Sequence, residues 1–380
     1  MSKLRKKNKQ AKQGRGERFS SFMAAAMAIP AVAGSLAHAQ STAPHDTTVR
    51  LQYSDYKDFQ SNSDRIKVKS PMLLIDTPIT ESTEFEGSFV LDSVSGASPL
   101  YLDSVSGASG TGISERRKAA DGTLTKFFEE FSLGVGGVFS SEDDYESRGL
   151  NLESSFWTPS KNTTYTIGIS ATEDDISCTN NAEIDESRTT YSFLAGISQI
   201  LNSRSLLQAN FTYSSADGYL SDPYKLNDNR PHSRDIGAVL MQYLLYFPAE
   251  DLSLHVDYRI TQDSWGLNSN MLEFSIYKPL AKKWLVRPSL RYYTQGSPDF
   301  FSSNYPPRNT NEFYSADQRL SAFGGITTSF MIQRDLSQGF SVDLELGYLQ
   351  QKSSFRPGGG SENISDFNAR FFTLGLTKKF

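Results

Sequence analysis

Charged side chains alternate with apolar ones in several segments of this sequence, and these charges are the residues best placed to perform a function. Each lies two residues from another polar side chain of its own segment. Because both signs are present, the groups can line a water-filled passage and select ions, or they can pair with each other and plug an interior. The sequence leaves these two alternatives open. The candidates are Asp257, Arg259, Arg287, Arg291, Asp343 and Glu345.

Catalysis has weaker support in the sequence. His255 falls in the same polar register as these charges, and no nucleophile, base and orienting acid can be arranged around it. A second group, His232 with Asp222, Asp228 and Asp235, could serve a protease, but a solvated loop accounts for it better. No zinc, nucleotide or flavin-attachment motif is present. We therefore predict that the protein is not an enzyme and needs no metal or other cofactor.

Long β-strands must position the charges, because the alternation has a period of two. In residues 252–261, Leu254, Val256 and Tyr258 share one face, whereas Asp257 and Arg259 share the other. Residues 340–348 repeat the pattern. Such segments exceed the roughly five or six residues usual in soluble sheets and match the roughly nine to eleven that cross a bilayer. The sequence predicts a transmembrane antiparallel β-barrel.

The charged faces of these strands are expected to line the barrel interior. An Arg or Lys that faces lipid at mid-bilayer costs roughly 2–4 kcal/mol, so the same expectation applies to charges in comparable positions elsewhere. These further charges are Arg50, Lys67, Lys69, Glu84, Glu86, Glu153 and Glu273.

Sixteen strands are predicted from the alternation and from tight links that are interleaved with longer polar ones. Residues 127–131 leave almost no room for a turn, so fourteen strands is the alternative. The predicted strands are 47–57, 65–76, 83–93, 123–130, 132–141, 146–157, 163–174, 187–199, 204–216, 232–247, 252–263, 269–279, 283–294, 317–332, 339–350 and 367–380.

The N-terminal residues indicate secretion. A basic stretch precedes an apolar segment from Phe19 to about Leu36, and Ala37-His38-Ala39 follows as a small-residue cleavage site. We predict a signal peptide at 1–39, a short periplasmic lead at 40–46 and the barrel at 47–380, located in the outer membrane of a Gram-negative bacterium. The net charge of −5 becomes more negative once the basic stretch is removed, which argues against a nucleic-acid partner.

The last strand has the pattern expected of an insertion signal. Phe372, Leu374, Leu376 and the terminal Phe380 share one face, and an apolar face with an aromatic end suits recognition by the barrel-assembly machinery and burial in outer-membrane lipid. Aromatic residues beside other tight turns predict a girdle at the periplasmic interface. This girdle comprises Trp157, Trp284, Tyr246, Phe247 and Phe380.

Several motifs resemble those of a known family. The segment DSVSGAS occurs twice, beginning at Asp92 and Asp103, and local turn chemistry predicts a compact outer loop for each copy. With GYLSDPYK at 218–225 and DSW at 263–265, the chain resembles an uncharacterised bacterial family of predicted outer-membrane barrels, over nearly its whole length from residue 47. The resemblance implies a location rather than an activity. Genes of that family often lie near the genes of a periplasmic flavin transferase and a small lipoprotein. The resemblance therefore implies a link to envelope redox chemistry or flavin handling.

Two functions from different classes fit these sequence features. In the first, the barrel is a channel or specific-uptake pore for small solutes. In the second, it is a non-conducting scaffold that docks periplasmic or lipoprotein partners. The sequence does not choose between them.

Overall fold

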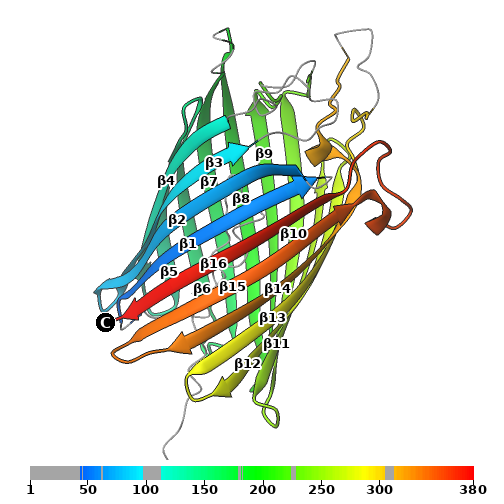
Figure 1. Ribbon diagram of the computed structural model, residues 1–380. Helices are drawn as coiled ribbons and strands as arrows, with labels where there is room; N and C mark the ends of the chain where they lie inside the picture. Colours follow the sequence, from blue (N-terminus) through cyan, green and yellow to red (C-terminus); the bar gives the residue numbers. More distant parts are fainter. Residues whose placement is uncertain are drawn as a thin grey trace, which may run out of the picture. The chain divides into compact units, whose positions relative to one another are not determined.

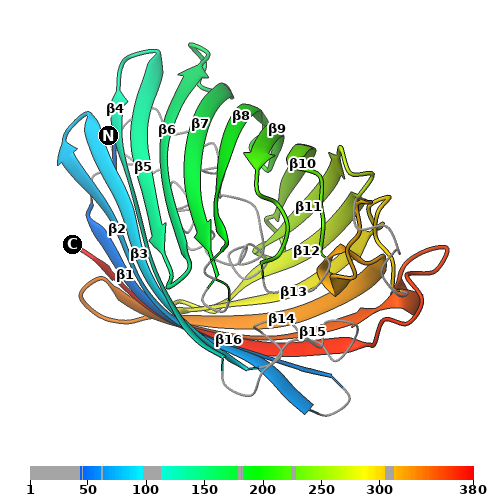
Figure 2. The same ribbon diagram turned by 90° about the horizontal axis from the view of Figure 1, so that it is seen from above.

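Sixteen antiparallel strands close into one barrel in the computed structural model (Figures 1 and 2). The structure describes residues 43–44, 46–60, 63–96, 113–178, 181, 183–223, 228–303 and 312–380. The strands are β1 (Thr48–Gln60), β2 (Ser63–Thr80), β3 (Thr83–Gly96), β4 (Ile113–Phe127), β5 (Phe131–Ser141), β6 (Tyr145–Trp157), β7 (Thr163–Ser177), β8 (Asp185–Asn202), β9 (Ser205–Gly218), β10 (Ser233–Phe247), β11 (Leu252–Asp263), β12 (Asn268–Ala281), β13 (Trp284–Gln295), β14 (Phe323–Asp335), β15 (Phe340–Lys352) and β16 (Phe367–Lys379).

Pairing of the first strand with the last completes the barrel. The β1–β16 register runs from Thr48 opposite Lys379 to Phe59 opposite Asn368, and Figure 1 shows the two strands side by side in blue and red. A closed sheet leaves no edge strand with unpaired backbone groups. The fold therefore meets the main requirement for spanning a bilayer with strands.

The predicted count of sixteen strands is confirmed, and fourteen is excluded. The crowded stretch accommodates a turn of three residues, 128–130, in which the Phe128 amide donates to the Phe131 carbonyl over 2.8 Å. The rings of Phe128 and Phe131 stack with centroids 4.4 Å apart. A tight aromatic turn therefore fits where the sequence left little room.

Three local predictions were wrong. Strand β4, predicted at 123–130, runs from Ile113 to Phe127. The prediction missed its first residues because they are polar and lack the alternation typical of a lipid-facing strand. Strand β14 begins at Phe323 rather than 317, because a 3-10 turn, η4 (Gln318–Leu320), precedes it. Residues 92–96 of the first DSVSGAS copy belong to β3 and not to a loop. The second copy, the predicted signal peptide and most of the predicted lead lie outside the described residues.

The two faces of the barrel wall differ in polarity. Leu150, Ile169 and Leu346 are among the most exposed side chains, whereas many serines, threonines and amides on the alternate positions are buried. This arrangement is the reverse of that in a soluble protein, and it is typical of a wall with lipid outside and polar groups inside. Among the described residues, no helix is both long and apolar enough to span a membrane.

The two ends of the barrel also differ. One end, here the turn end, carries tight links such as residues 336–339 between β14 and β15. Gly339 has a φ of 77°, and a Cβ on it would lie 2.4 Å from the Lys379 carbonyl oxygen, so this turn requires glycine. The opposite end, the loop end, carries the longer connections 219–232, 296–322 and 353–366.

Candidate functional site

All six predicted candidate charges lie on the inward face of the wall. Asp257 and Arg259 belong to β11, Arg287 and Arg291 to β13, and Asp343 and Glu345 to β15. Their neighbours in sequence, such as Ile260, Leu290 and Leu344, are exposed apolar residues of the outward face. The strands bring the six charges to one half of the interior, and their role in selectivity stays a prediction.

Arg50 of β1 reaches over β16 to Asp343 of β15. Its guanidinium donates to the two carboxylate oxygens over 2.6 and 2.9 Å, and it also contacts Gln52 and Thr377. Gly375 of the intervening strand makes the crossing feasible, since a Cβ there would lie 2.3 Å from Arg50 Nη2. A bidentate Arg–Asp pair is a strong, geometrically fixed interaction.

Arg287 makes a second pair that passes over a strand. Its Nη2 lies 2.9 Å from Glu345 Oε2, with β14 between them, and its guanidinium also lies 5.6 Å from the centre of the Tyr277 ring. Only 4% of Arg287 is exposed. The charge is therefore compensated where water is scarce.

Arg291 pairs with a direct neighbour. Its Nη2 lies 2.6 Å from Glu273 Oε2 on β12, and the two residues are opposite each other in the register. Glu273 in turn lies opposite Asp257, whose Oδ1 accepts a hydrogen bond of 3.2 Å from the Gln242 amide on β10. A row of polar side chains thus runs from β10 to β13, with one contact at each end, Gln242–Asp257 and Glu273–Arg291.

Arg259 differs from the other candidates because it is exposed. It lies on the inward face one step toward the loop end from Asp257, and it forms no ion pair within the part of the chain that the structure describes. An exposed arginine on the inner face requires water-accessible space beside it. Of the six candidates, Arg259 is therefore the best placed to act on a passing ion.

The ion pairs among these candidates follow the wall. Each joins adjacent strands, as Arg291 and Glu273 do, or strands separated by one, as in the pairs of Arg50 and Arg287. Pairs that plugged the barrel would have to join opposite walls. The described contacts of the candidates therefore favour a lined interior over a plugged one.

Two of the further predicted lumen charges, Lys67 and Lys69, lie on the outward face, so this prediction was wrong. Lys69 is opposite Asp55 of β1 and Ser93 of β3, in the register that also places Leu51 opposite Leu73. The error arose because Ile66 and Val68, which alternate with the lysines, are apolar residues that point inward. Toward the loop end, polarity no longer reports which face meets lipid.

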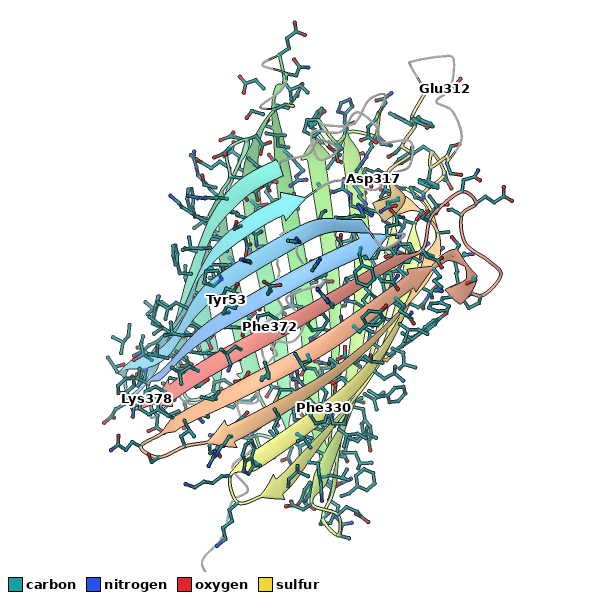
Figure 3. All side chains as sticks on the ribbon, viewed as in Figure 1. Tyr53, Glu312, Asp317, Phe330, Phe372 and Lys378 are labelled. Carbon is teal, nitrogen blue, oxygen red and sulfur yellow. The ribbon has the colours of Figure 1, made fainter. Side chains whose placement is uncertain are left out.

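A charged loop cluster at the loop end was not predicted from the sequence. Arg230 lies 2.9 Å from Asp317 and 2.8 Å from Asp228, and Arg319 lies 2.6 Å from Asp222. The cluster joins the β9–β10 and β13–β14 loops, and Figure 3 labels Asp317 at this end of the barrel. No periodic pattern marks loop residues 70 or more positions apart, so sequence alone offers no signal for their contact.

The inner wall supports this loop cluster. Gln295, at the loop end of β13, donates to the carbonyl oxygens of Arg319 and Ser321 over 2.9 and 2.7 Å. Asp317 and Ser321 are fully buried. Residues 317–321 of the β13–β14 loop are therefore folded against the inner side of the wall.

The protease-like group is not assembled. Asp222 and Asp228 are held by the arginines of the loop cluster, and His232 lies 3.3 Å from the Gly218 carbonyl oxygen. His255 packs against Tyr277 with ring centroids 4.4 Å apart. Within the described residues, His232 contacts no nucleophile.

Three carboxylates gather near the turn end of β2 and β3. The ligand atoms of Asp76, Glu84 and Glu86 lie within 4.8 Å of one another, because Asp76 is opposite Glu86 and Pro78 is opposite Glu84. Acidic groups in such proximity are common without a bound ion, and we assign no ligand to them.

The predicted insertion residues lie as their alternation requires. Phe372, Leu374 and Leu376 are on the outward face, and Phe380 is 70% exposed with the Lys378 ammonium 5.3 Å from its ring centre. Trp157 does not join the predicted girdle, because it is buried and donates to the Glu129 carbonyl over 2.8 Å. The part that Phe380 plays in insertion stays a prediction.

Solved outer-membrane barrels share this fold. One, described as a bacterial polysaccharide outer membrane secretin, superposes with a TM-score of 0.51 at 8% identity, covering 88% of this chain and 98% of that one. CdiB from Acinetobacter baumannii has a TM-score of 0.51 at 9% identity, and the match covers 87% of this chain but only 60% of CdiB. At these identities the similarity establishes the fold alone.

Sequence comparison assigns the family. No curated protein matches the chain. The profile described as "Protein of unknown function (DUF3570)" matches residues 19–111, 102–187 and 179–371, which together span most of the sequence. The closed sixteen-stranded barrel with its charge-lined interior therefore belongs to the DUF3570 family of proteins of unknown function.

Proposed function

We propose that this protein is an outer-membrane channel for small polar solutes, with Arg259 as the principal charge that a passing ion meets. The observation that carries the proposal is the exposure of Arg259 on the inner face of a sixteen-stranded barrel. Barrels of about eight strands are filled by their own side chains, whereas those of sixteen to eighteen strands leave an aqueous channel. Strand number and an accessible lumen cation thus support the same function.

The paired charges have a second part in this proposal. Three ion pairs, Arg50–Asp343, Arg287–Glu345 and Arg291–Glu273, hold these charges close to the wall, and Gln242 does the same for Asp257. These side chains therefore polarise the passage without crossing it. Fixed charges of both signs along a wall favour passage of hydrated polar solutes.

The loop cluster is proposed to restrict the entrance. In the orientation usual for such barrels, the tight turns are periplasmic and the long loops extracellular, which places Asp222, Arg230, Asp317 and Arg319 at the extracellular mouth. Since Gln295 ties Arg319 and Ser321 to the inner wall, this end of the β13–β14 loop narrows the opening.

Planar-bilayer recording of the refolded protein tests the channel. We expect stable ohmic steps from preparations that also show the heat-dependent shift in SDS migration of a closed barrel. Preparations that show the shift but remain electrically silent would contradict the channel and favour the scaffold that docks periplasmic or lipoprotein partners. A sample with no shift and a helical circular dichroism spectrum would contradict the barrel itself.

A further inference from the structure

Basic side chains gather toward the loop end on the outward face of β16, β1, β2 and β4, four of five neighbouring strands. Lys57 of β1 is directly opposite both Lys67 of β2 and Arg370 of β16. Like charges in such cross-strand positions destabilise a sheet unless something compensates them. We call this surface the outer basic patch, and it comprises Lys57, Lys67, Lys69, Arg116, Lys118 and Arg370.

Acidic side chains compensate this patch only in part. Asp55 lies on the same face opposite Lys69. Within the described part of the chain, Lys69, Lys118 and Arg370 form no ion pair, and all three are exposed. The patch therefore presents a local excess of positive charge at the rim of the apolar band.

Strands β6 and β7, farther along the wall, have no such excess. At the loop end of β6 and β7, the outward residues are Glu146, Arg148, Glu173 and Asp175. The Arg148 guanidinium contacts Glu146, and Asp175 lies 3.8 Å away. Positive charge at this level is thus not a general feature of the rim.

An apolar groove lies next to the patch, on the turn-end side. Its volume is about 350 Å³, and it is lined by Leu51, Tyr53, Leu73, Phe89, Leu91 and Leu374 among others. Figure 3 shows Tyr53 beside Phe372 on this part of the wall, where the two ring centroids are 5.9 Å apart. Strands β16, β1 and β2 therefore carry parts of both the patch and the groove.

Pro71 lies in the groove lining and interrupts the wall there. The β2–β3 register includes Lys69 opposite Ser93 and Met72 opposite Val90, with no pair between them. Proline has no backbone N–H to donate to the ladder, and it marks irregular positions in sheets. Pro71 is thus the local cause of the groove in the sequence.

We propose that strands β16 to β4 bind a phosphate-bearing lipid of the outer leaflet, with its phosphates on the outer basic patch and one acyl chain in the groove. The proposal rests on the orientation given under the proposed function, which places the patch at the extracellular interface. Lys and Arg form charge-assisted hydrogen bonds with phosphate oxygens, and an apolar groove in a lipid-facing wall suits an acyl chain. Lipid with a neutral or zwitterionic headgroup would satisfy only the groove.

Native mass spectrometry of the protein refolded in a neutral maltoside detergent tests this site, with lipid A and phosphatidylcholine as probes. The variant K69Q/K118Q/R370Q removes three exposed patch cations, and R204Q/K282Q/K283Q removes three from periplasmic turns as a matched control. We expect the patch variant to weaken lipid A binding by roughly tenfold to a hundredfold and the control to bind like the wild type. Equal lipid A binding by both variants would overturn the proposal, as would equal wild-type binding of the two lipids.

A second arm separates lipid from free phosphate. Leu73→Trp fills the groove, and we expect it to weaken lipid A binding without altering the heat-dependent shift in SDS migration. Millimolar inorganic phosphate should fail to displace lipid A from the wild type. If phosphate displaces the lipid and Leu73→Trp has no effect, the site binds phosphate rather than a lipid. Conductance is recorded in a separate experiment. A failure of the channel proposal is therefore distinguishable from a failure of the lipid-binding proposal.

Discussion

The half of the barrel made by β11–β16 and β1 differs from the half made by β5–β9 in what it turns toward the interior. The first half carries the arginines and carboxylates, in pairs such as Arg50–Asp343 and Arg287–Glu345. The second carries mostly small neutral groups, with Ser155 and Thr166 sharing a hydrogen bond of 3.0 Å in its centre. Its inward charges are fewer, namely Glu153 and the pair Arg188–Asp174 near the loop end. Both halves form long antiparallel ladders, so the larger number of charges in the first half is not needed to build the wall.

The energetic difference between the halves indicates where function lies. A buried ion pair often stabilises no better than well-packed neutral groups, because both charges lose hydration. Neutral side chains could therefore have stabilised the wall equally well in both halves. We interpret the charged half as the side that acts on solutes and the neutral half as structural, and three variants test this difference.

The largest effect is expected from breaking a pair in the charged half. Arg287→Ala leaves Glu345 with an uncompensated charge, which should lower the free energy of unfolding by about 3–5 kcal/mol. The double variant R287M/E345L removes both charges and should recover most of this loss. Urea titration, followed by the folded and unfolded bands on SDS gels, measures the unfolding midpoint of both variants. An unchanged midpoint for Arg287→Ala would show that the pair does not stabilise the barrel.

An intermediate effect is expected at Gly375. Ala at this position places a Cβ 2.3 Å from the Arg50 guanidinium, so the arginine must leave Asp343, and we expect a loss of about 1–3 kcal/mol. In an Arg50→Ser background the same substitution should be nearly neutral, because the side chain in the way is gone. Additive losses in the double-mutant cycle would contradict this role of Gly375.

A small effect is expected in the neutral half. Thr166→Val removes the hydrogen bond with Ser155 and should lower the free energy of unfolding by about 1 kcal/mol. Because no charge changes, the ion preference of the conductance should stay that of the wild type. A clear change in ion preference would show that the neutral half also acts on solutes, and the proposed division would fail.

Sequence alone predicted much of this fold, because lipid outside and water inside impose a period of two on every strand. That rule correctly placed Asp343 on the inner face and the next residue, Leu344, on the outer face. It failed for Lys67 and Lys69, which lie near the loop end, where the outer face meets headgroups and no longer demands apolar residues. The same rule could not predict which charged residues form ion pairs with each other. Arg50 meets Asp343 only because of barrel closure and Gly375, and Arg230 meets Asp317 only through loop folding.

The reversal potential of single channels across a KCl gradient tests the central claim most directly. Arg259→Glu reverses the exposed lumen charge, and Lys283→Glu makes the same change in a periplasmic turn as its control. Both variants should fold, because both side chains are exposed. We predict that Arg259→Glu shifts the reversal potential toward cation preference, while Lys283→Glu matches the wild type. An Arg259→Glu channel with the wild-type reversal potential would contradict the proposal that this arginine faces the conducting path.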